Sequence, residues 1–146
     1  VEDFSMNDRC AAGTGRFLEV MAKVLELDPE EMASLASRSS RELSISSVCT
    51  VFAESEVVSL IGRGEKIEDI SAGLFNAIVK RVAAMYARLG SPEPLVFTGG
   101  VARNAGVVHA MERVFKRKVI LPEVPDIMGA YGAALFATDR QGEKGQ

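Results

Sequence analysis

The residues in this sequence that are best suited to chemistry are its two cysteines, Cys10 and Cys49. Each comes just before a stretch with a helical pattern, and the N-terminus of a helix favours the thiolate form of a nearby cysteine. Small residues from Ala11 to Gly15 follow Cys10 and leave room beside it for a bulky group. The alternative is that both are buried free cysteines, a common role of cysteine in proteins. The residues alone leave both interpretations open.

The number of possible ligands limits what these cysteines can bind. A tetrahedral zinc site or a 4Fe-4S cluster takes four protein ligands, mostly thiolates. The chain has two cysteines and one histidine, His109, which lies in a predicted amphipathic helix and is expected at the surface. One chain therefore cannot complete such a site. Two copies related by a twofold axis can, because that symmetry presents the same pair of cysteines twice.

A second candidate site is a pair of glycines, Gly99 and Gly100, that separates a short apolar run at 95–97 from a predicted helix. Glycines at the end of a strand allow a sharp turn and the close approach of a ligand, and the following helix offers unpaired N–H groups. Nucleotides bind beyond the carboxyl ends of such strands. A plain turn between strand and helix explains the same residues, so this pattern alone leaves nucleotide binding open.

Two acidic residues, Glu54 and Glu56, begin another predicted helix. Two residues apart, they cannot share one helix face, so one could bind a ribose hydroxyl while the other faces water. Acids in the first turn also commonly serve only the helix dipole and solvent.

Hydrophobic periodicity and helix start and stop residues predict the elements that position these groups. We expect helices over about 14–26, 52–61, 67–89, 104–115 and 126–138, and one that starts at 28 and ends within 37–42. We expect strands at 95–97 and 119–121, and at 1–6 the last strand of a hairpin whose partner is missing. The run Asp28-Pro29-Glu30-Glu31 supplies a cap, a proline at the first position and two acids for the helix dipole. The glycines and alanines of the last helix would let it pack closely against a neighbouring backbone. The order predicts an α/β domain with a helical insertion.

Composition bounds the possible functions. With 146 residues, 47% of them hydrophobic, the chain can form one globular domain. A net charge of −3 argues against nonspecific nucleic-acid binding. The sequence has neither an apolar run long enough to span a membrane nor a signal-peptide pattern, so a cytoplasmic protein is expected. Because the chain begins at Val1, we expect it to be part of a longer protein, with one lobe at 1–138 and a flexible tail at 139–146.

Three segments form long motifs in a fixed order: 6–19 (MNDRCAAGTGRFLE), 49–56 (CTVFAESE) and 97–104 (FTGGVARN). Together they resemble the 2-hydroxyacyl-CoA dehydratase activators and the related ATP-binding subunits of benzoyl-CoA reductase. The resemblance covers nearly the whole chain, up to about Ala137. Three motifs in order are far more specific than a lone pair of glycines.

The resemblance implies one lobe of an actin/hexokinase-like (ribonuclease H-like) ATPase fold, in which two related α/β lobes enclose the nucleotide. It implies a homodimer, or a heterodimer of paralogues, with one 4Fe-4S cluster held by Cys10 and Cys49 of both subunits. It also implies ATP or ADP with Mg²⁺ as ligand. The expected cofactor-binding residues are Gly99, Gly100, Val101 and Asn104, together with Gly13, Thr14, Gly15 and Glu54.

The activity implied is the ATP-driven transfer of low-potential electrons from ferredoxin or flavodoxin to a CoA-thioester dehydratase or reductase. In the family, a phosphate loop and a second glycine-rich phosphate strand precede the segments matched here, and this sequence contains neither. We therefore expect the chain to keep the cysteines and the adenosine side of the site without hydrolysing ATP by itself.

Two alternatives remain, a non-redox small-molecule kinase and a regulatory nucleotide-binding domain of the same superfold. A kinase should place an aspartate near a substrate hydroxyl, and Asp3, Asp8 and Asp28 lie in unpromising contexts.

Overall fold

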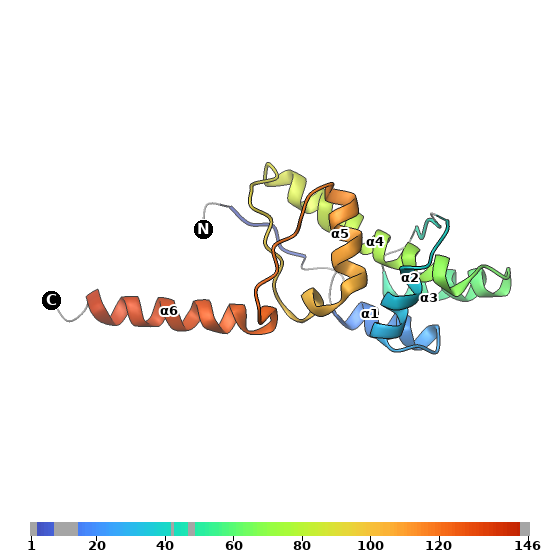
Figure 1. Ribbon diagram of the computed structural model, residues 1–146, viewed down its shortest axis with the longest axis horizontal. Helices are drawn as coiled ribbons and strands as arrows, with labels where there is room; N and C mark the ends of the chain where they lie inside the picture. Colours follow the sequence, from blue (N-terminus) through green and yellow to red (C-terminus); the bar gives the residue numbers. More distant parts are fainter. Residues whose placement is uncertain (1–2, 8–14, 42, 47–48, 144–146) are drawn as a thin grey trace.

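The computed structural model describes residues 3–7, 15–41, 43–46 and 49–143, and within them the chain is mostly helical (Figure 1). The α-helices are α1 (Gly15–Val24), α2 (Pro29–Ala36), α3 (Thr50–Gly62), α4 (Ile67–Arg88), α5 (Ala105–Phe115) and α6 (Met128–Glu143). Two short 3₁₀ helices, η1 (Gly100–Arg103) and η2 (Pro125–Ile127), precede α5 and α6. The predicted helices are thus all present, with ends shifted by a few residues.

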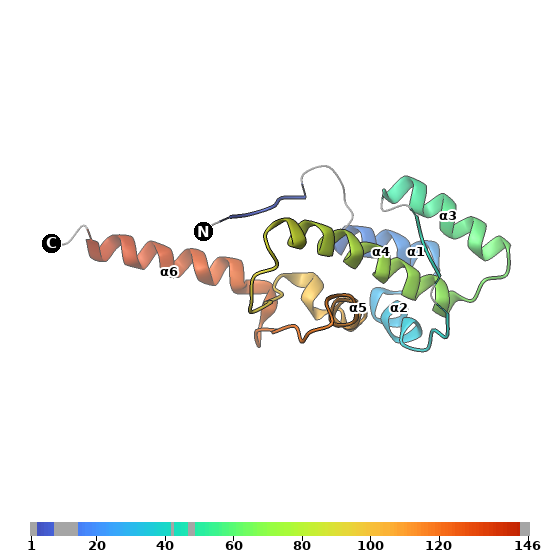
Figure 2. The ribbon, with the colours of Figure 1, turned by 90° about the horizontal axis from the view of Figure 1, so that it is seen from above.

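Helix α4 is the centre of the helical body, and α2, α3 and α5 all pack against it (Figure 2). Every residue from Asp69 to Val79 is buried, because neighbouring helices cover this stretch on several sides. The helical spacing of the sequence predicts one apolar face made of Ile70, Leu74, Ile78, Val82 and Met85; the first three lie in this core, whereas Val82 and Met85 are only half-buried. The periodicity of the sequence therefore predicted the helix and three of the five residues of its apolar face, but not the burial of the whole stretch from Asp69 to Val79.

Helices α1 and α3 pack against each other beside this centre. Phe17, Leu18 and Met21 of α1 are buried, as are Ala53 and Val57 of α3. Their spacing of three or four residues gives each helix one apolar side, and these sides form a common core with α4.

The two strands predicted in the last third lie side by side but form only a short contact. Val96 and Ile120 make an isolated parallel bridge. The N–H of Phe97 donates to the Ile120 carbonyl at 3.0 Å, and the N–H of Ile120 donates to the Leu95 carbonyl at 2.9 Å. The predicted strand at 1–6 is not formed over residues 3–6, since no ladder partner for them exists in the described part of the chain.

Helix α6 extends away from the helical body in both views (Figures 1 and 2). It begins later than predicted, because η2 takes up Pro125–Ile127, and it continues to Glu143, past the expected end of the lobe at 138. Within the ranges described above, no helix is long and apolar enough to cross a membrane.

Candidate functional site

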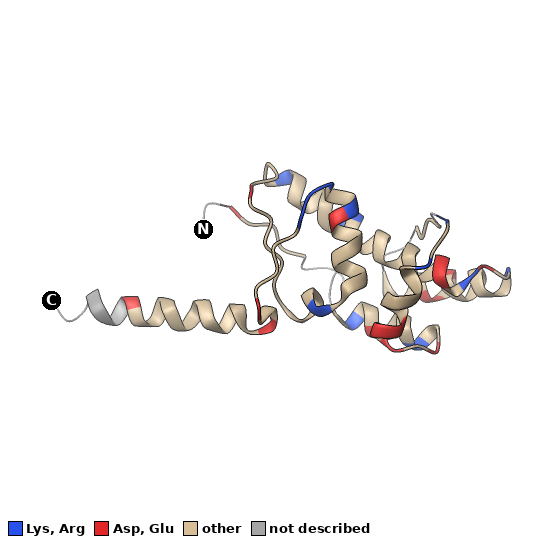
Figure 3. Cartoon of the chain, viewed as in Figure 1, with Lys and Arg blue, Asp and Glu red and all other residues tan. Residues whose placement is uncertain are grey.

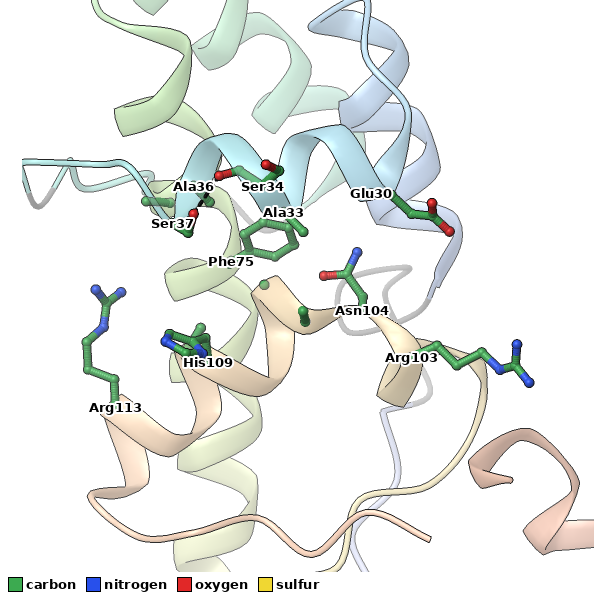
Figure 4. A pocket seen from close by; sticks show the side chains of 14 residues that line it. Glu30, Ala33, Ser34, Ala36, Ser37, Phe75, Arg103, Asn104, His109 and Arg113 are labelled. Carbon is green, nitrogen blue, oxygen red and sulfur yellow. Dashed lines mark hydrogen bonds between the residues drawn. The ribbon is translucent and has the colours of Figure 1, made fainter. Parts of the chain in front are cut away.

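A pocket of about 450 Å³ opens between α2, α4 and α5 (Figure 4). Its size is typical of sites for small molecules. The walls come from one face of α2, from the start of α5 with the end of η1, and from α4 beneath them. The lining residues include Glu30, Ala33, Ser34, Ser37, Phe75, Arg103, Asn104, Gly106, His109 and Arg113.

The wall formed by α2 is positioned by the start of that helix. The Asp28 carboxylate accepts hydrogen bonds from the N–H groups of Glu30 (2.9 Å) and Glu31 (2.7 Å), and the Glu31 carboxylate accepts one from the N–H of Asp28 (3.0 Å). This reciprocal capping box confirms the helix start predicted at Asp28.

Asn104 joins this wall to the opposite one. Its side-chain oxygen accepts a hydrogen bond from the N–H of Val107 (3.1 Å) and so caps α5. Its side-chain nitrogen donates to the carbonyl of Pro29, at the start of α2 (3.1 Å). One amide therefore sets the spacing between the two helices that form the pocket.

The floor of the pocket depends on a close approach of α5 to α4. A Cβ atom on Gly106 would lie 2.6 Å from Cε2 of Phe75, closer than real Cβ contacts. The Phe75 side chain is buried below, and α5 can lie on its ring because position 106 has no side chain. This contact gives the pocket an aromatic base between two helices.

The predicted glycine turn lies directly before this wall. Gly99 has a φ of +91°, a backbone conformation that favours glycine, and η1 begins at the next residue. The N–H of Gly99 donates to the carbonyl of Pro125 in η2 at 2.8 Å. The turn therefore directs η1 both toward the pocket and against η2.

An ion pair strengthens the contact between η1 and η2. Nε of Arg103 donates to a carboxylate oxygen of Asp126 at 2.7 Å. This hydrogen bond holds the pKa of Asp126 below its usual value, although partial burial opposes the effect. Asp126 is thus held in its charged form beside the pocket-lining Arg103.

The structure brings some of the predicted cofactor residues together. Asn104 lines the pocket, whereas Gly99, Gly100 and Val101 precede it in the chain and are not among the lining residues. A Cβ atom on Gly15, at the start of α1, would lie 3.6 Å from Cγ2 of Val101, so two of the predicted motifs meet here.

Other predicted residues fall elsewhere. Glu54 is exposed on α3, a helix that does not line the pocket, so the structure does not bring it to this site. Cys10, Gly13 and Thr14 lie outside the described residues.

Several residues that line the pocket were not predicted as site residues from the sequence. His109 is exposed as predicted, yet it also lines the pocket. The glycine motif predicted a nucleotide site at 99–104, whereas the opposite wall of the pocket comes from α2, which is distant in sequence. One side of α2 carries the small residues Ala33, Ser34 and Ser37, and this pattern could have indicated a helix face with room for a ligand.

The second cysteine, Cys49, comes directly before α3 and does not line the pocket. Cys49 is exposed and occupies the N-cap position without a hydrogen bond from its side chain to the helix. The first turn of α3 contains no acid, so no carboxylate offsets the positive end of the helix dipole. The expectation of the alternative interpretation that Cys49 is buried is wrong, while its thiol forms no disulfide in the described residues.

The segment before Cys49 is attached to α3. The Glu56 carboxylate accepts hydrogen bonds from the N–H and the hydroxyl of Ser46, each at 3.0 Å. Val51 and Phe52, which follow Cys49 in the chain, are 69% and 67% exposed, so the start of α3 carries two exposed apolar side chains. Glu56 thus holds the backbone near the cysteine, and the second acid of the predicted pair has a structural role.

Comparison with known proteins gives consistent matches. Residues 1–137 match the BadF/BadG/BcrA/BcrD ATPase family. The chain is 52% identical, over 141 residues, to the 2-hydroxyisocaproyl-CoA dehydratase activator of Clostridioides difficile, covering 97% of this chain and 53% of that protein. It is 47% identical, over 144 residues, to the activator of lactoyl-CoA dehydratase of Anaerotignum propionicum, covering 99% of this chain and 56% of that protein.

A solved structure shares the same fold. The activator of the 2-hydroxyisocaproyl-CoA dehydratase from Clostridium difficile, with bound ADPNP, is 51% identical and gives a TM-score of 0.89. The match covers 99% of this chain and 54% of that one. The chain therefore spans about half the length of these relatives.

Proposed function

Because the chain belongs to the BadF/BadG/BcrA/BcrD ATPase family, we propose that it supplies the adenosine side of a nucleotide site and a pair of cluster ligands in an ATP-dependent activator. The whole activator would take low-potential electrons from ferredoxin or flavodoxin and pass them to a CoA-thioester dehydratase or reductase. Similar chains carry the names of activators of two CoA dehydratases, and the similar activator structure contains ADPNP.

The observation that carries the nucleotide part is the pocket between α2 and α5. It has an aromatic ring at Phe75 and small residues on α2, which suit a flat adenine base, and a carboxylate at Glu30, which suits a ribose hydroxyl. The glycine turn at Gly99 precedes η1, and the last residue of η1, Arg103, lines the pocket, which agrees with a strand-turn-helix that binds nucleotides. ATP or ADP, with Mg²⁺ on its phosphates, is the proposed ligand.

Calorimetric titration of the 146-residue chain with Mg-ADP tests this assignment. Ala33, at the pocket wall, can be replaced to fill the space, and we expect Ala33→Phe to weaken ADP binding about tenfold or more. Ala84→Phe, at an exposed position of α4, is the matched control and should bind ADP as the unaltered chain does. Equal affinity of both variants would place the nucleotide elsewhere. In the same preparation we expect binding of ATP without its hydrolysis.

The cluster part of the proposal rests on Cys49. Its thiol is exposed at the N-terminus of α3, a position that suits an anionic iron–sulfur group. Cys10 would be the second ligand. Since one chain supplies two thiolates, two subunits, identical or paralogous, would share one 4Fe-4S cluster, and the exposed apolar surface at Val51 and Phe52 suits such a contact. When bound, the cluster would supply one-electron transfer.

Anaerobic reconstitution of the chain with iron and sulfide tests the ligands without any assay of electron transfer. We expect one cluster, and therefore about four iron atoms, for each pair of chains. Cys10→Ala and Cys49→Ala should each prevent assembly, whereas Ser59→Ala, exposed on α3, should not. If either cysteine variant formed the same absorbing species, the ligand assignment would be wrong.

A further inference from the structure

The contact between η1 and η2 lies just outside the pocket and joins two segments that are separate in sequence. It consists of the hydrogen bond from the N–H of Gly99 to the Pro125 carbonyl (2.8 Å) and the Arg103–Asp126 pair (2.7 Å). We call these two bonds the η1–η2 clasp. The clasp holds both ends of η1, because Gly99 precedes that helix and Arg103 is its last residue.

Arg103 belongs to the clasp and to the pocket at once. Its side chain lines the end of the pocket where Glu30 and Asn104 also lie (Figure 4). In that view, Arg103 extends away from Phe75, so the stem borders the pocket while the guanidinium reaches outward to Asp126. Asp126 does not line the pocket, and it can affect a ligand there only through its neighbours.

The other polar residue at this end is already fixed. Asn104 uses both ends of its amide, one for the N–H of Val107 and one for the Pro29 carbonyl. Arg103, in contrast, is exposed, and a long arginine side chain has many rotamers when nothing holds it. Released from Asp126, the guanidinium could turn toward the carboxylate of Glu30 across the pocket mouth. The pair with Asp126 keeps the guanidinium directed away from the pocket.

We propose that Asp126 is a positioning residue for nucleotide binding, which acts by holding the Arg103 side chain as a fixed wall of the pocket. The inference rests on the proposed function, because the ligand is the same nucleotide. It adds a residue outside the pocket and outside the predicted glycine motif. It also makes η2, at the base of α6, part of the nucleotide-binding structure.

A double-mutant cycle on the 146-residue chain, read by titration with Mg-ADP, tests the proposal. We expect Asp126→Asn to weaken ADP binding by about fivefold, and Arg103→Ala to weaken it about as much or more, in the range of a charge-assisted hydrogen bond. The double variant should bind as weakly as Arg103→Ala alone, because Asp126 acts only through Arg103. Asp126→Glu, which keeps the charge, should restore most of the affinity.

A control and a second ligand separate this role from a general effect on folding. Glu93→Gln removes a comparable ion pair with Arg117 (2.9 Å) that lies outside the pocket, and it should leave ADP binding unchanged. Adenosine, which has no phosphates, should show the same ratio between the variants as ADP, because Arg103 borders the pocket and not a phosphate site.

Each outcome decides between the two proposals. If the unaltered chain binds neither ADP nor adenosine, both the proposed function and this inference fail. If it binds ADP but Asp126→Asn binds equally well, or if the two substitutions add, Asp126 does not act through Arg103 and only this inference fails.

Discussion

Helices α4 and α6 are the two longest helices of the chain, and they differ most in what surrounds them. Helix α4 is buried from Asp69 to Val79 by three other helices. Helix α6 carries no charged residue before Asp139, yet Tyr131, Leu135 and Phe136 are exposed, and its contacts in the described residues are mainly with η2. The apolar composition of a helix therefore does not show which element the helix packs against.

Charged residues are also distributed differently in the helical body and in α6 (Figure 3). Acidic and basic residues are spread over the helices of the body, whereas the part of α6 nearest to η2 has no charged residue after Asp126. In the body, most buried residues are apolar, in agreement with the helix packing. In α6, apolar composition is present without the packing that normally accompanies it. The comparison predicts that similar substitutions have different effects in the two helices.

The largest difference is expected for phenylalanine. Phe75 in α4 is 1% exposed and Phe136 in α6 is 62% exposed. Phe75→Ala should lower the free energy of unfolding by about 3–5 kcal/mol, because it leaves a cavity beneath α5. Phe136→Ala should change it by less than about 0.5 kcal/mol. Urea unfolding followed by circular dichroism measures both, and equal losses would show that α6 is packed in solution.

Glycine substitutions in the helical body and in α6 should also differ in their effect on stability, by a smaller amount. Gly106→Ala forces a Cβ atom against Phe75, where the distance would be 2.6 Å, and should cost about 1–3 kcal/mol of stability. Gly132 in α6 has nothing within 4 Å of such an atom. Gly132→Ala should therefore stabilise the chain by about 0.5–1 kcal/mol through helix propensity alone. Thermal unfolding distinguishes the two signs, and a destabilised Gly132→Ala would argue for a close neighbour of α6.

A third comparison concerns aspartates at a helix start and within a helix. Asp28→Ala removes the capping box of α2 and should cost about 1 kcal/mol, within the usual range of 0.5–2 for such caps. Asp139→Ala, at an exposed position within α6, should have an effect below about 0.5 kcal/mol. The measurement is again the midpoint of urea unfolding. A loss at Asp28 no larger than that at Asp139 would mean that the capping box contributes nothing to stability.

Local sequence features predicted the helices well because they depend on neighbours three or four residues away. The start at Asp28 and the buried positions Ile70, Leu74 and Ile78 are examples. The family resemblance was also correct, since three motifs in order are a property of the sequence itself.

Features that need two distant segments could not be predicted in this way. The pocket requires α2 to face α5, and the close contact of Gly106 with Phe75 appears only when α5 lies on α4. The clasp between Arg103 and Asp126 likewise joins residues whose separate motifs gave no sign of each other. For α6, small residues suggested close packing, but composition does not say which surface supplies the contact.

Loss of structure in acid should begin in the helical body and not in α6. Asp69 of α4 is buried and accepts hydrogen bonds from the Ser39 hydroxyl (2.8 Å) and from the N–H groups of Ser40 (3.2 Å) and Arg41 (3.3 Å). The Ser39 hydrogen bond, more than the backbone ones, holds the pKa of Asp69 below its usual value, against the opposing effect of burial. Its pKa is thus lower in the folded chain than in the unfolded chain.

It follows that the contribution of Asp69 to stability is fully present above about pH 4, the usual range of an aspartate, and is lost as the pH falls through the lower folded value. Asp69→Asn should therefore reduce stability near neutral pH and flatten its dependence on pH below about 4. Ser39→Ala should shift the acid transition in the same direction by a smaller amount, because the two backbone donors remain. Hydrogen exchange should show the segment at 39–41 opening first in acid. If α6 lost protection before that segment did, the first step of acid unfolding would not be the protonation of Asp69, and this prediction would be wrong.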